Sequence, residues 1–166
     1  MTVLTYFAYG SNMLSNRLRG RVPSARPIGP AELHGWSLRF HKRGADGSAK
    51  CNVVLEPGGL VNGVLFEIAH AEKRRLDLAE GLGSGYEQAT VSVTSLLGAV
   101  EGFLYVASAS HIDEGLAPFD WYKDFVIYGA LEHRLAIDYI GRLRAIEALS
   151  DPDVGRAIEN RRILGV

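Results

Sequence analysis

Hydrophobic and polar residues alternate in short runs over the first two thirds of the chain, a pattern typical of half-buried β-strands. In two places a glycine-containing segment separates a pair of such runs, as in a β-hairpin. The runs are Val3–Tyr9, Trp36–Phe40, the pair Cys51–Leu55 and Val61–Ile68 around Pro57-Gly58-Gly59, and the pair Thr90–Leu96 and Val100–Val106 around Gly98. We therefore expect six strands, mostly in antiparallel pairs.

Elsewhere apolar residues recur every three or four positions, which is the spacing of a helix with one buried face. This spacing predicts helices at Met13–Arg19, Ala71–Ala79, Phe119–Glu132 and Ile137–Leu149, followed by a short amphipathic tail over Val154–Leu164. Gly81 suits a left-handed cap at the end of the second helix, and Pro152 should end the fourth. The pattern predicts an α+β fold, a mixed six-stranded β-barrel or curved sheet with helices packed around it.

Composition limits the classes of partner. The chain has 166 residues with no repeat or linker, so we expect a single domain spanning residues 1–166. Its 18 Lys and Arg against 19 Asp and Glu give a net charge of -1, which argues against binding to nucleic acid or an anionic membrane. The single cysteine, Cys51, excludes an internal disulfide. The sequence has no signal peptide and no apolar run near the ~20 residues of a membrane span, so we expect a cytoplasmic protein. We expect it to be a monomer or a homodimer.

The segment Gly10-Ser11-Asn12 follows the first strand directly and has two interpretations. It can be an ordinary strand-to-helix turn, with Ser11 or Asn12 as the helix N-cap and Gly10 supplying an unusual φ. It can also be a nest of backbone N–H groups that binds a carboxylate or a developing oxyanion. Phosphate binding is poorly supported, because neither a Walker sequence nor G-x-G-x-x-G is present.

Glu80 is the candidate acid–base residue, although a solvated surface glutamate is the alternative. It lies at the predicted C-terminus of a helix, where the negative end of the helix dipole opposes ionisation of a carboxylate. Asp77, one turn earlier, should add like-charge repulsion. Both effects oppose ionisation of Glu80 and so make its carboxylate a stronger base, as a general base working near neutrality requires. Four tyrosines that can hydrogen-bond are candidate pocket walls or core residues: Tyr6, Tyr9, Tyr86 and Tyr122.

Other catalytic chemistries find little support in the sequence. The five histidines are scattered, with no H-E-x-x-H and no His/Cys cluster, so we expect no metal site. Ser11 lacks the G-x-S-x-G context of a serine nucleophile. Cys51 lies in a strand-like run, which favours packing over catalysis. An enzyme built from these residues would not rely on covalent catalysis.

Four segments, in this order along the chain, resemble those of the γ-glutamylcyclotransferase family in the AIG2-like superfamily. They are YFAYGSNM at the N-terminus, ADGSAKCNVV, LDLAEGLGSGY in the middle, and a C-terminal segment with Pro118, Tyr122 and Gly129-Ala130. Phe119 stands where that family often has serine or threonine after the proline, and Ala136 where proline is usual. These two departures concern the outer shape of a pocket more than its chemistry.

The resemblance implies a fold, an activity and a site. The fold is a mixed β-barrel with packed helices, and the activity is cyclisation of a γ-glutamyl amide to 5-oxoproline with release of an amino acid or amine. Neither a cofactor nor a metal is needed, and the partner is a small γ-glutamyl substrate. Glu80 would be the general acid/base, and backbone N–H groups of Tyr9, Gly10, Ser11 and Asn12 would hold the carboxylate and the oxyanion. Tyr6, Phe7, Ala8 and Tyr122 would also contact the glutamyl group, and Tyr86 is a further candidate wall.

The leaving group should occupy a pocket formed by Arg39–Lys50 and the C-terminal helices. Its identity stays open among amino acids, amines, glutathione and a γ-glutamyl-protected metabolite, although the loop ending Gly-Ser-Asn-Met slightly disfavours glutathione. Two rival functions also stay open. One is a non-catalytic γ-glutamyl-binding, carboxylate-binding or protein-interaction module on the same fold, and the other is an acyltransferase or amidohydrolase using the same oxyanion cradle.

Overall fold

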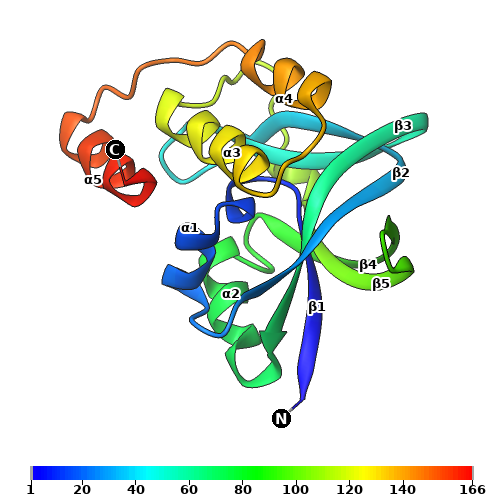
Figure 1. Ribbon diagram of the computed structural model, residues 1–166. Helices are drawn as coiled ribbons and strands as arrows, with labels where there is room; N and C mark the ends of the chain where they lie inside the picture. The colour runs from blue at the N-terminus through cyan, green and yellow to red at the C-terminus, as the bar shows by residue number, and fades with distance from the viewer. Residues whose placement is uncertain (1, 166) are drawn as a thin grey trace.

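Five β-strands close into a barrel in the order β1-β3-β2-β4-β5. The computed structural model describes residues 2–165. The strands are β1 Val3–Ala8, β2 Arg26–Arg43, β3 Ala49–Ala69, β4 Tyr86–Ser95 and β5 Gly98–Ala107. Neighbouring strands are antiparallel except for β1 and β5, which pair in parallel through Tyr6 and Phe103 and so close the barrel. The α+β class and the barrel are confirmed (Figure 1).

The prediction of six strands is wrong by one, because Pro57-Gly58-Gly59 does not form a turn between paired strands. The runs on either side of it belong to the single long strand β3, and both pair with β2. The register between β2 and β3 shifts at this point, between the pairs His34–Leu60 and Trp36–Leu55. A Cβ on Gly59 would lie 2.4 Å from the carbonyl oxygen of Trp36. The glycine therefore permits a close approach within an irregular sheet.

The predicted hairpin around Gly98 is confirmed, and its two strands are longer than expected. Ser95 pairs with Gly98, so the connection is Leu96-Leu97, and both leucines are exposed. The pairing continues to Tyr86 and Ala107 at the far end. Because β4 begins at Tyr86, the barrel wall starts directly after the glycine-rich segment that follows Glu80.

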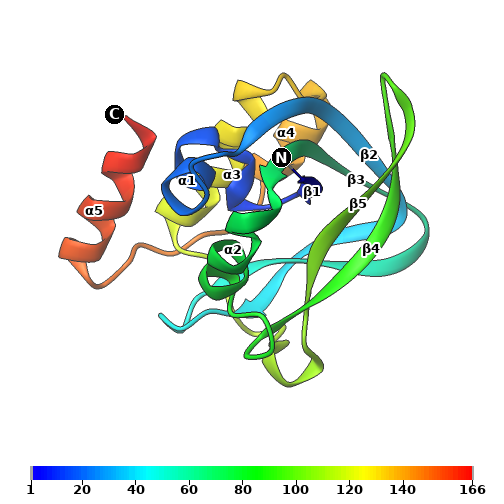
Figure 2. The same ribbon diagram turned by 90° about the horizontal axis from the view of Figure 1, so that it is seen from below.

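Five α-helices pack outside the barrel: α1 Ser15–Arg21, α2 Lys73–Glu80, α3 Asp120–Glu132, α4 Ile137–Arg144 and α5 Val154–Leu164. Short 3₁₀ helices precede α1 and α2, at Ser11–Met13 and His70–Glu72. Figures 1 and 2 show α1, α2 and α3 beside the barrel, with α5 farthest from it. No helix within residues 2–165 is long and apolar enough to cross a membrane.

The predicted helix Ile137–Leu149 ends five residues early, at Arg144, and Pro152 does not end it. The reason is a tertiary contact at Leu149. Its backbone N–H donates to the carbonyl of Pro118, and its carbonyl accepts from the N–H of Asp120, both near 2.9 Å. These two bonds draw the chain back to the start of α3. The amphipathic tail predicted over residues 154–164 folds as the helix α5.

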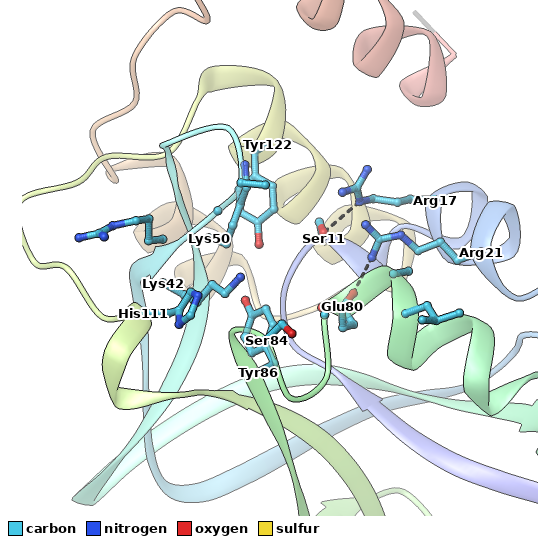
Figure 3. A pocket seen from close by; sticks show the side chains of 16 residues that line it. Ser11, Arg17, Arg21, Lys42, Lys50, Glu80, Ser84, Tyr86, His111 and Tyr122 are labelled. Atoms are coloured by element: carbon cyan, nitrogen blue, oxygen red, sulfur yellow. Dashed lines mark hydrogen bonds and ion pairs between the residues drawn. The ribbon is translucent and has the colours of Figure 1, made fainter.

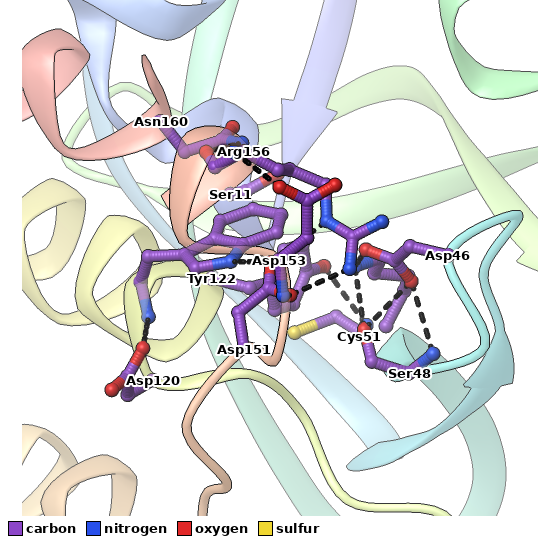
Figure 4. A network of polar contacts seen from close by, with 12 residues as sticks. Ser11, Asp46, Ser48, Cys51, Asp120, Tyr122, Asp151, Asp153, Arg156 and Asn160 are labelled. Carbon is purple, nitrogen blue, oxygen red and sulfur yellow. Dashed lines mark hydrogen bonds and ion pairs between the residues drawn. The ribbon is translucent and has the colours of Figure 1, made fainter. Parts of the chain in front are cut away.

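The buried carboxylate of Asp151 joins the segment before α5 to α3 and also pairs with an arginine of α5 (Figure 4). The side chain of Asp151 is fully buried and accepts from both Arg156 Nε at 2.7 Å and Arg156 Nη2 at 2.6 Å. It also accepts from the indole N–H of Trp121 at 2.8 Å. The hydrogen bonds from Arg156, and then that from Trp121, hold the pKa of this carboxyl well below its usual range.

This pair should make the stability of the protein depend on pH. Because the folded-state pKa of Asp151 is depressed, its contribution is complete above about pH 4, the ordinary value for an unfolded aspartate, and is lost as pH falls below it. Urea unfolding midpoints measured from roughly pH 5 to pH 2 should fall more steeply in the parent than in Asp151→Asn. Asp138→Asn, which removes an exposed partner of Arg142, is the control and should keep the parent slope. Equal slopes for all three proteins would contradict the prediction.

Candidate functional site

Two connected cavities lie between α1, the end of α2 and one edge of the barrel. The larger is an open pocket of about 470 Å³. The smaller is an inner space of about 30 Å³, which holds no more than one or two waters. Ser11, Glu80, Tyr86 and Tyr122 line both, so the inner space opens into the larger pocket (Figure 3). Its remaining lining residues are Tyr6, Tyr9, Gly10, Asn12 and Cys51.

The loop after β1, whose residues Gly10, Ser11 and Asn12 line this inner space, has unpaired backbone N–H groups. Met13 N–H donates to the Gly10 carbonyl at 3.0 Å, which closes a 3₁₀ turn. Within residues 2–165 no hydrogen bond uses the N–H of Gly10, Ser11 or Asn12. Neither Ser11 nor Asn12 caps a helix with its side chain. The loop therefore has the free donors that a nest requires and lacks the side-chain cap of an ordinary turn.

Gly10 is required for packing, and the unusual φ considered from the sequence is not present. Its φ is -117°, which other residues also adopt. A Cβ at this position would lie 3.0 Å from Cys51 Cβ and 3.5 Å from the Tyr122 hydroxyl. The glycine thus brings the loop against β3 and α3, where the inner space lies.

Glu80 ends α2 and points at the loop. Gly81 follows with φ 71° and ψ 45°, the left-handed cap that the sequence predicts. Glu80 Oε1 accepts from Asn12 Nδ2 at 2.8 Å and from Arg21 Nη1 at 2.5 Å. No described residue donates to Oε2. One carboxylate oxygen is therefore held by the protein, while the other remains available to a ligand.

Asn12 links the acid to the barrel. Its amide nitrogen also contacts the Tyr6 hydroxyl at 3.0 Å, and its carbonyl accepts from Arg21 at 2.9 Å. Burial, and then the charge of Glu80, raise the pKa of Tyr6 well above its usual value, so this hydroxyl stays protonated. The arrangement fixes the orientation of the Glu80 carboxylate from two sides.

The prediction that Asp77 repels Glu80 is wrong, because the negative charge of Asp77 is paired with a lysine. Asp77 Oδ1 accepts from Lys73 and from the hydroxyl of Tyr105, the latter at 2.7 Å. A lysine thus compensates its charge, and the nearest charged partner of Glu80 is Arg21. Because Arg21 comes from α1, its pairing with an acid at the end of α2 is a tertiary contact that helix periodicity cannot predict.

The other tyrosines have distinct bonding roles at the inner space. Tyr86 donates to the Cys51 carbonyl at 2.6 Å, and Tyr122 accepts from the Cys51 N–H at 2.9 Å. Tyr9 turns its hydroxyl to the carbonyl of Tyr105. Burial raises the pKa of all three hydroxyls and raises that of the Cys51 thiol to about 12, so these four side chains face the inner space uncharged.

Two of the predicted contact residues line neither cavity. Phe7 and Ala8 are fully buried and belong to the barrel core. Their side chains therefore shape the strand beneath the loop. Within the predicted leaving-group segment, residues 42 to 45 and Lys50 line the larger pocket, whereas Arg39 bonds Ser37 and Glu56 elsewhere. Of the C-terminal helices only α3 contributes, through Tyr122.

The sequence analysis included Lys42, Arg43 and Lys50 within the segment predicted for the leaving group, but it did not identify the two arginines of α1. Arg17 and Arg21 are four residues apart on α1, which places them on one helix face. Arg17 donates to Ser11 Oγ at 3.0 Å and lies 4.5 Å from the Phe125 ring centroid. The spacing of these two arginines, directly after the loop, was the available signal. Lys42 and Lys50 enter from β2 and β3 and carry no comparable pattern.

Comparison with known proteins agrees with the architecture. A family model described as gamma-glutamyl cyclotransferase, AIG2-like, matches residues 6–123. The gamma-glutamylcyclotransferase of Homo sapiens is 31% identical over 148 residues, covering 86% of this chain and 78% of the human protein, and that of Bos taurus is 30% identical with the same coverage. A solved structure named gamma-glutamyl cyclotransferase superposes with a TM-score of 0.83 at 27% identity, covering 95% of this chain and 99% of the other.

The family match contains the elements that form the two cavities. It begins at Tyr6 in β1 and extends past Tyr122 in α3, so the loop, Glu80 and the glycine-rich segment before Tyr86 all lie inside it. The chain is a member of the gamma-glutamyl cyclotransferase, AIG2-like family.

Proposed function

We propose that the protein cyclises a γ-glutamyl amide, releasing 5-oxoproline and a free amino acid or amine, with Glu80 as general acid/base. One observation carries the proposal. The unbonded Oε2 of Glu80 and three unpaired backbone N–H groups of the loop border the same inner space. A proton acceptor and an oxyanion-binding site are the two groups that an amide-forming cyclisation needs.

The glutamyl end of the substrate is a zwitterion, and the site offers a partner for each of its charges. The α-ammonium fits beside Glu80, which is the only carboxylate among the described residues of the larger pocket. The α-carboxylate and the γ-carbonyl oxygen fit the N–H groups of Gly10, Ser11 and Asn12. Arg17, which bonds Ser11, adds positive charge on that side.

The reaction requires two proton transfers at Glu80. Its carboxylate accepts a proton from the α-ammonium, and the freed amine attacks the γ-carbonyl carbon to form a five-membered ring. A second proton leaves the same nitrogen, the amide C–N bond breaks, and the departing nitrogen is protonated. The two protons lost by the α-nitrogen are the two that the leaving amine gains, so the reaction balances without water.

Intramolecular attack also explains why the site contains no evident nucleophile of its own. The Cys51 thiol, whose pKa burial raises to about 12, is poorly suited to the task. Holding the substrate folded provides an effective molarity on the order of 10⁵ M or more for well-aligned groups. The loop and Glu80 then need only align the reacting atoms and move protons.

The proposal predicts the product. Incubation of the purified protein with γ-glutamyl-alanine should yield alanine and 5-oxoproline in equal amounts, measured by chromatography. An amidohydrolase would release glutamate instead, and a binding module would bind the compound without releasing alanine. Failure to form 5-oxoproline from any of a panel of γ-glutamyl amino acids and amines would refute the proposed function.

A further inference from the structure

The larger pocket is strongly cationic although the whole chain carries a net charge of -1. Its lining holds five basic side chains and one carboxylate among the described residues: Arg17, Arg21, Lys42, Arg43 and Lys50 against Glu80. Figure 3 shows Arg17, Arg21 and Glu80 on one side of the space, with Lys42, Lys50 and His111 across from them. The second group enters the pocket from β2, β3 and the segment at His111, across from Glu80, and we place the leaving part of a substrate on that side.

Three of the five cations are already paired. Arg21 bonds Glu80, Arg43 bonds Asp113 at 2.9 Å, and Lys50 bonds Asp46 at 2.8 Å. Neither Asp46 nor Asp113 is among the lining residues, so both pairs present their cationic end to the pocket. The partners reduce these charges and do not reverse the sign of the surface.

Lys42 has neither an ion-pair nor a hydrogen-bond partner within residues 2–165, yet it is only 9% exposed. Its ammonium lies 4.5 Å from the Tyr86 ring centroid. A Cβ on Gly85 would lie 3.0 Å from Lys42 Nζ, so this glycine allows the ammonium to lie against the loop. Burial lowers the pKa of Lys42, while the charges of Glu80 and Asp46 act in the other direction.

An ammonium that is largely covered by protein and faces a pocket without a protein acceptor is partly desolvated, and an anionic ligand would offset that loss of solvation. The glutamyl head cannot supply the anion, because its single carboxylate belongs with the loop and Arg17. The positive charge of Lys42 is therefore left to pair with an anionic group on the leaving part of the substrate. A leaving amine, which carries no acid group, would leave it unmatched.

We propose that the leaving part of the substrate is an acidic amino acid whose side-chain carboxylate pairs with Lys42. This inference rests on the proposed cyclisation and narrows its substrate class. Lys50 and Arg43 extend the positive surface beside Lys42 and favour a leaving residue with two carboxylates over one with a single carboxylate. Substrates with a neutral leaving amino acid should be processed less efficiently, and substrates with a leaving amine least efficiently.

The test compares γ-glutamyl-glutamate with γ-glutamyl-glutamine, which differ by one charge at nearly constant size. The parent should process the glutamate compound with a kcat/KM roughly tenfold or more above that of the glutamine compound. Lys42→Met should remove this preference mainly by slowing the glutamate compound. Because Lys42 has no partner to lose, the variant should melt at or above the parent temperature. Arg74→Gln, which removes an exposed positive charge from α2, is the control and should keep the parent ratio.

Two results would overturn the inference: equal kcat/KM values in the parent, or a preference that survives Lys42→Met. A calorimetric titration separates this failure from failure of the proposed function. With the Glu80→Gln variant, the glutamate compound should bind more tightly than the glutamine compound, and Lys42→Met in the same background should equalise them. Equal binding of the two compounds to Glu80→Gln refutes the anion subsite, whereas absence of 5-oxoproline when the parent is given every compound of the γ-glutamyl panel refutes the cyclisation.

Discussion

Replacement of Glu80 by glutamine should leave a folded protein whose release of 5-oxoproline is slower by about 10²–10⁴-fold. Glutamine has the same size, and its Oε1 can still accept from Asn12 and Arg21 as the carboxylate does. It cannot take a proton from the α-ammonium, so the attacking amine is not formed at the rate the parent allows. The loss should appear in kcat measured with γ-glutamyl-alanine at neutral pH.

An unfolding measurement and a matched control variant distinguish loss of the catalytic group from damage to the fold. The Glu80–Arg21 pair is partly exposed, with 15% and 23% of the two side chains accessible, so its loss should change the free energy of unfolding by no more than about 1 kcal/mol. Glu101→Gln makes the same chemical change at an exposed position of β5 and should keep parent activity. If Glu80→Gln releases 5-oxoproline at the parent rate, Glu80 has no part in the mechanism.

Gly129→Ala should be a strongly disruptive small substitution near the site. A Cβ at Gly129 of α3 would lie 2.6 Å from the backbone nitrogen of Leu14 and 2.7 Å from the carbonyl carbon of Met13. Neither is a flexible side-chain end, so α3 or the loop must move. Overpacking of this kind costs about 1–3 kcal/mol, and it should outweigh the ~1 kcal/mol that alanine gains over glycine in a helix.

The same displacement should reduce activity, because the N–H groups of the loop move with Met13. A misplacement of about 1 Å can cost up to 10²-fold in rate. Gly141→Ala is a matched control in α4: no atom lies within 4 Å of the Cβ it would gain. That variant should gain about 1 kcal/mol and keep parent kcat/KM. Urea unfolding and kcat/KM measured on both variants provide the comparison, and an unchanged midpoint and rate for Gly129→Ala would show that the contact does not position the loop.

Prediction from sequence succeeded where the local pattern and the tertiary structure agree. β1, the hairpin around Gly98, and α5 follow from alternation or from a repeat of three to four residues. Glu80 followed by Gly81 in a left-handed conformation is a local signal as well, because a glycine at that position ends a helix.

Prediction failed where a distant segment decides the outcome. Pro57-Gly58-Gly59 has the composition of a turn, yet β2 continues past it and pairs on both sides. Helix α4 stops early because Leu149 bonds Pro118 and Asp120 instead of its own helix. In both cases backbone hydrogen bonds to another element outweigh a local preference that is worth less than one such bond.

The sequence by itself determined the strand and helix types, the acid at the end of α2, the tyrosines and the small polar loop that ends β1. It also determined the total charge. Only the tertiary structure decided that Arg21 holds one oxygen of Glu80, that Asp77 is neutralised by Lys73, and that a chain of nearly zero net charge lines one pocket with cations. The physical reason is that electrostatic interaction depends on distance and burial, and residues from α1, β2, β3 and α2 acquire these only when the barrel closes.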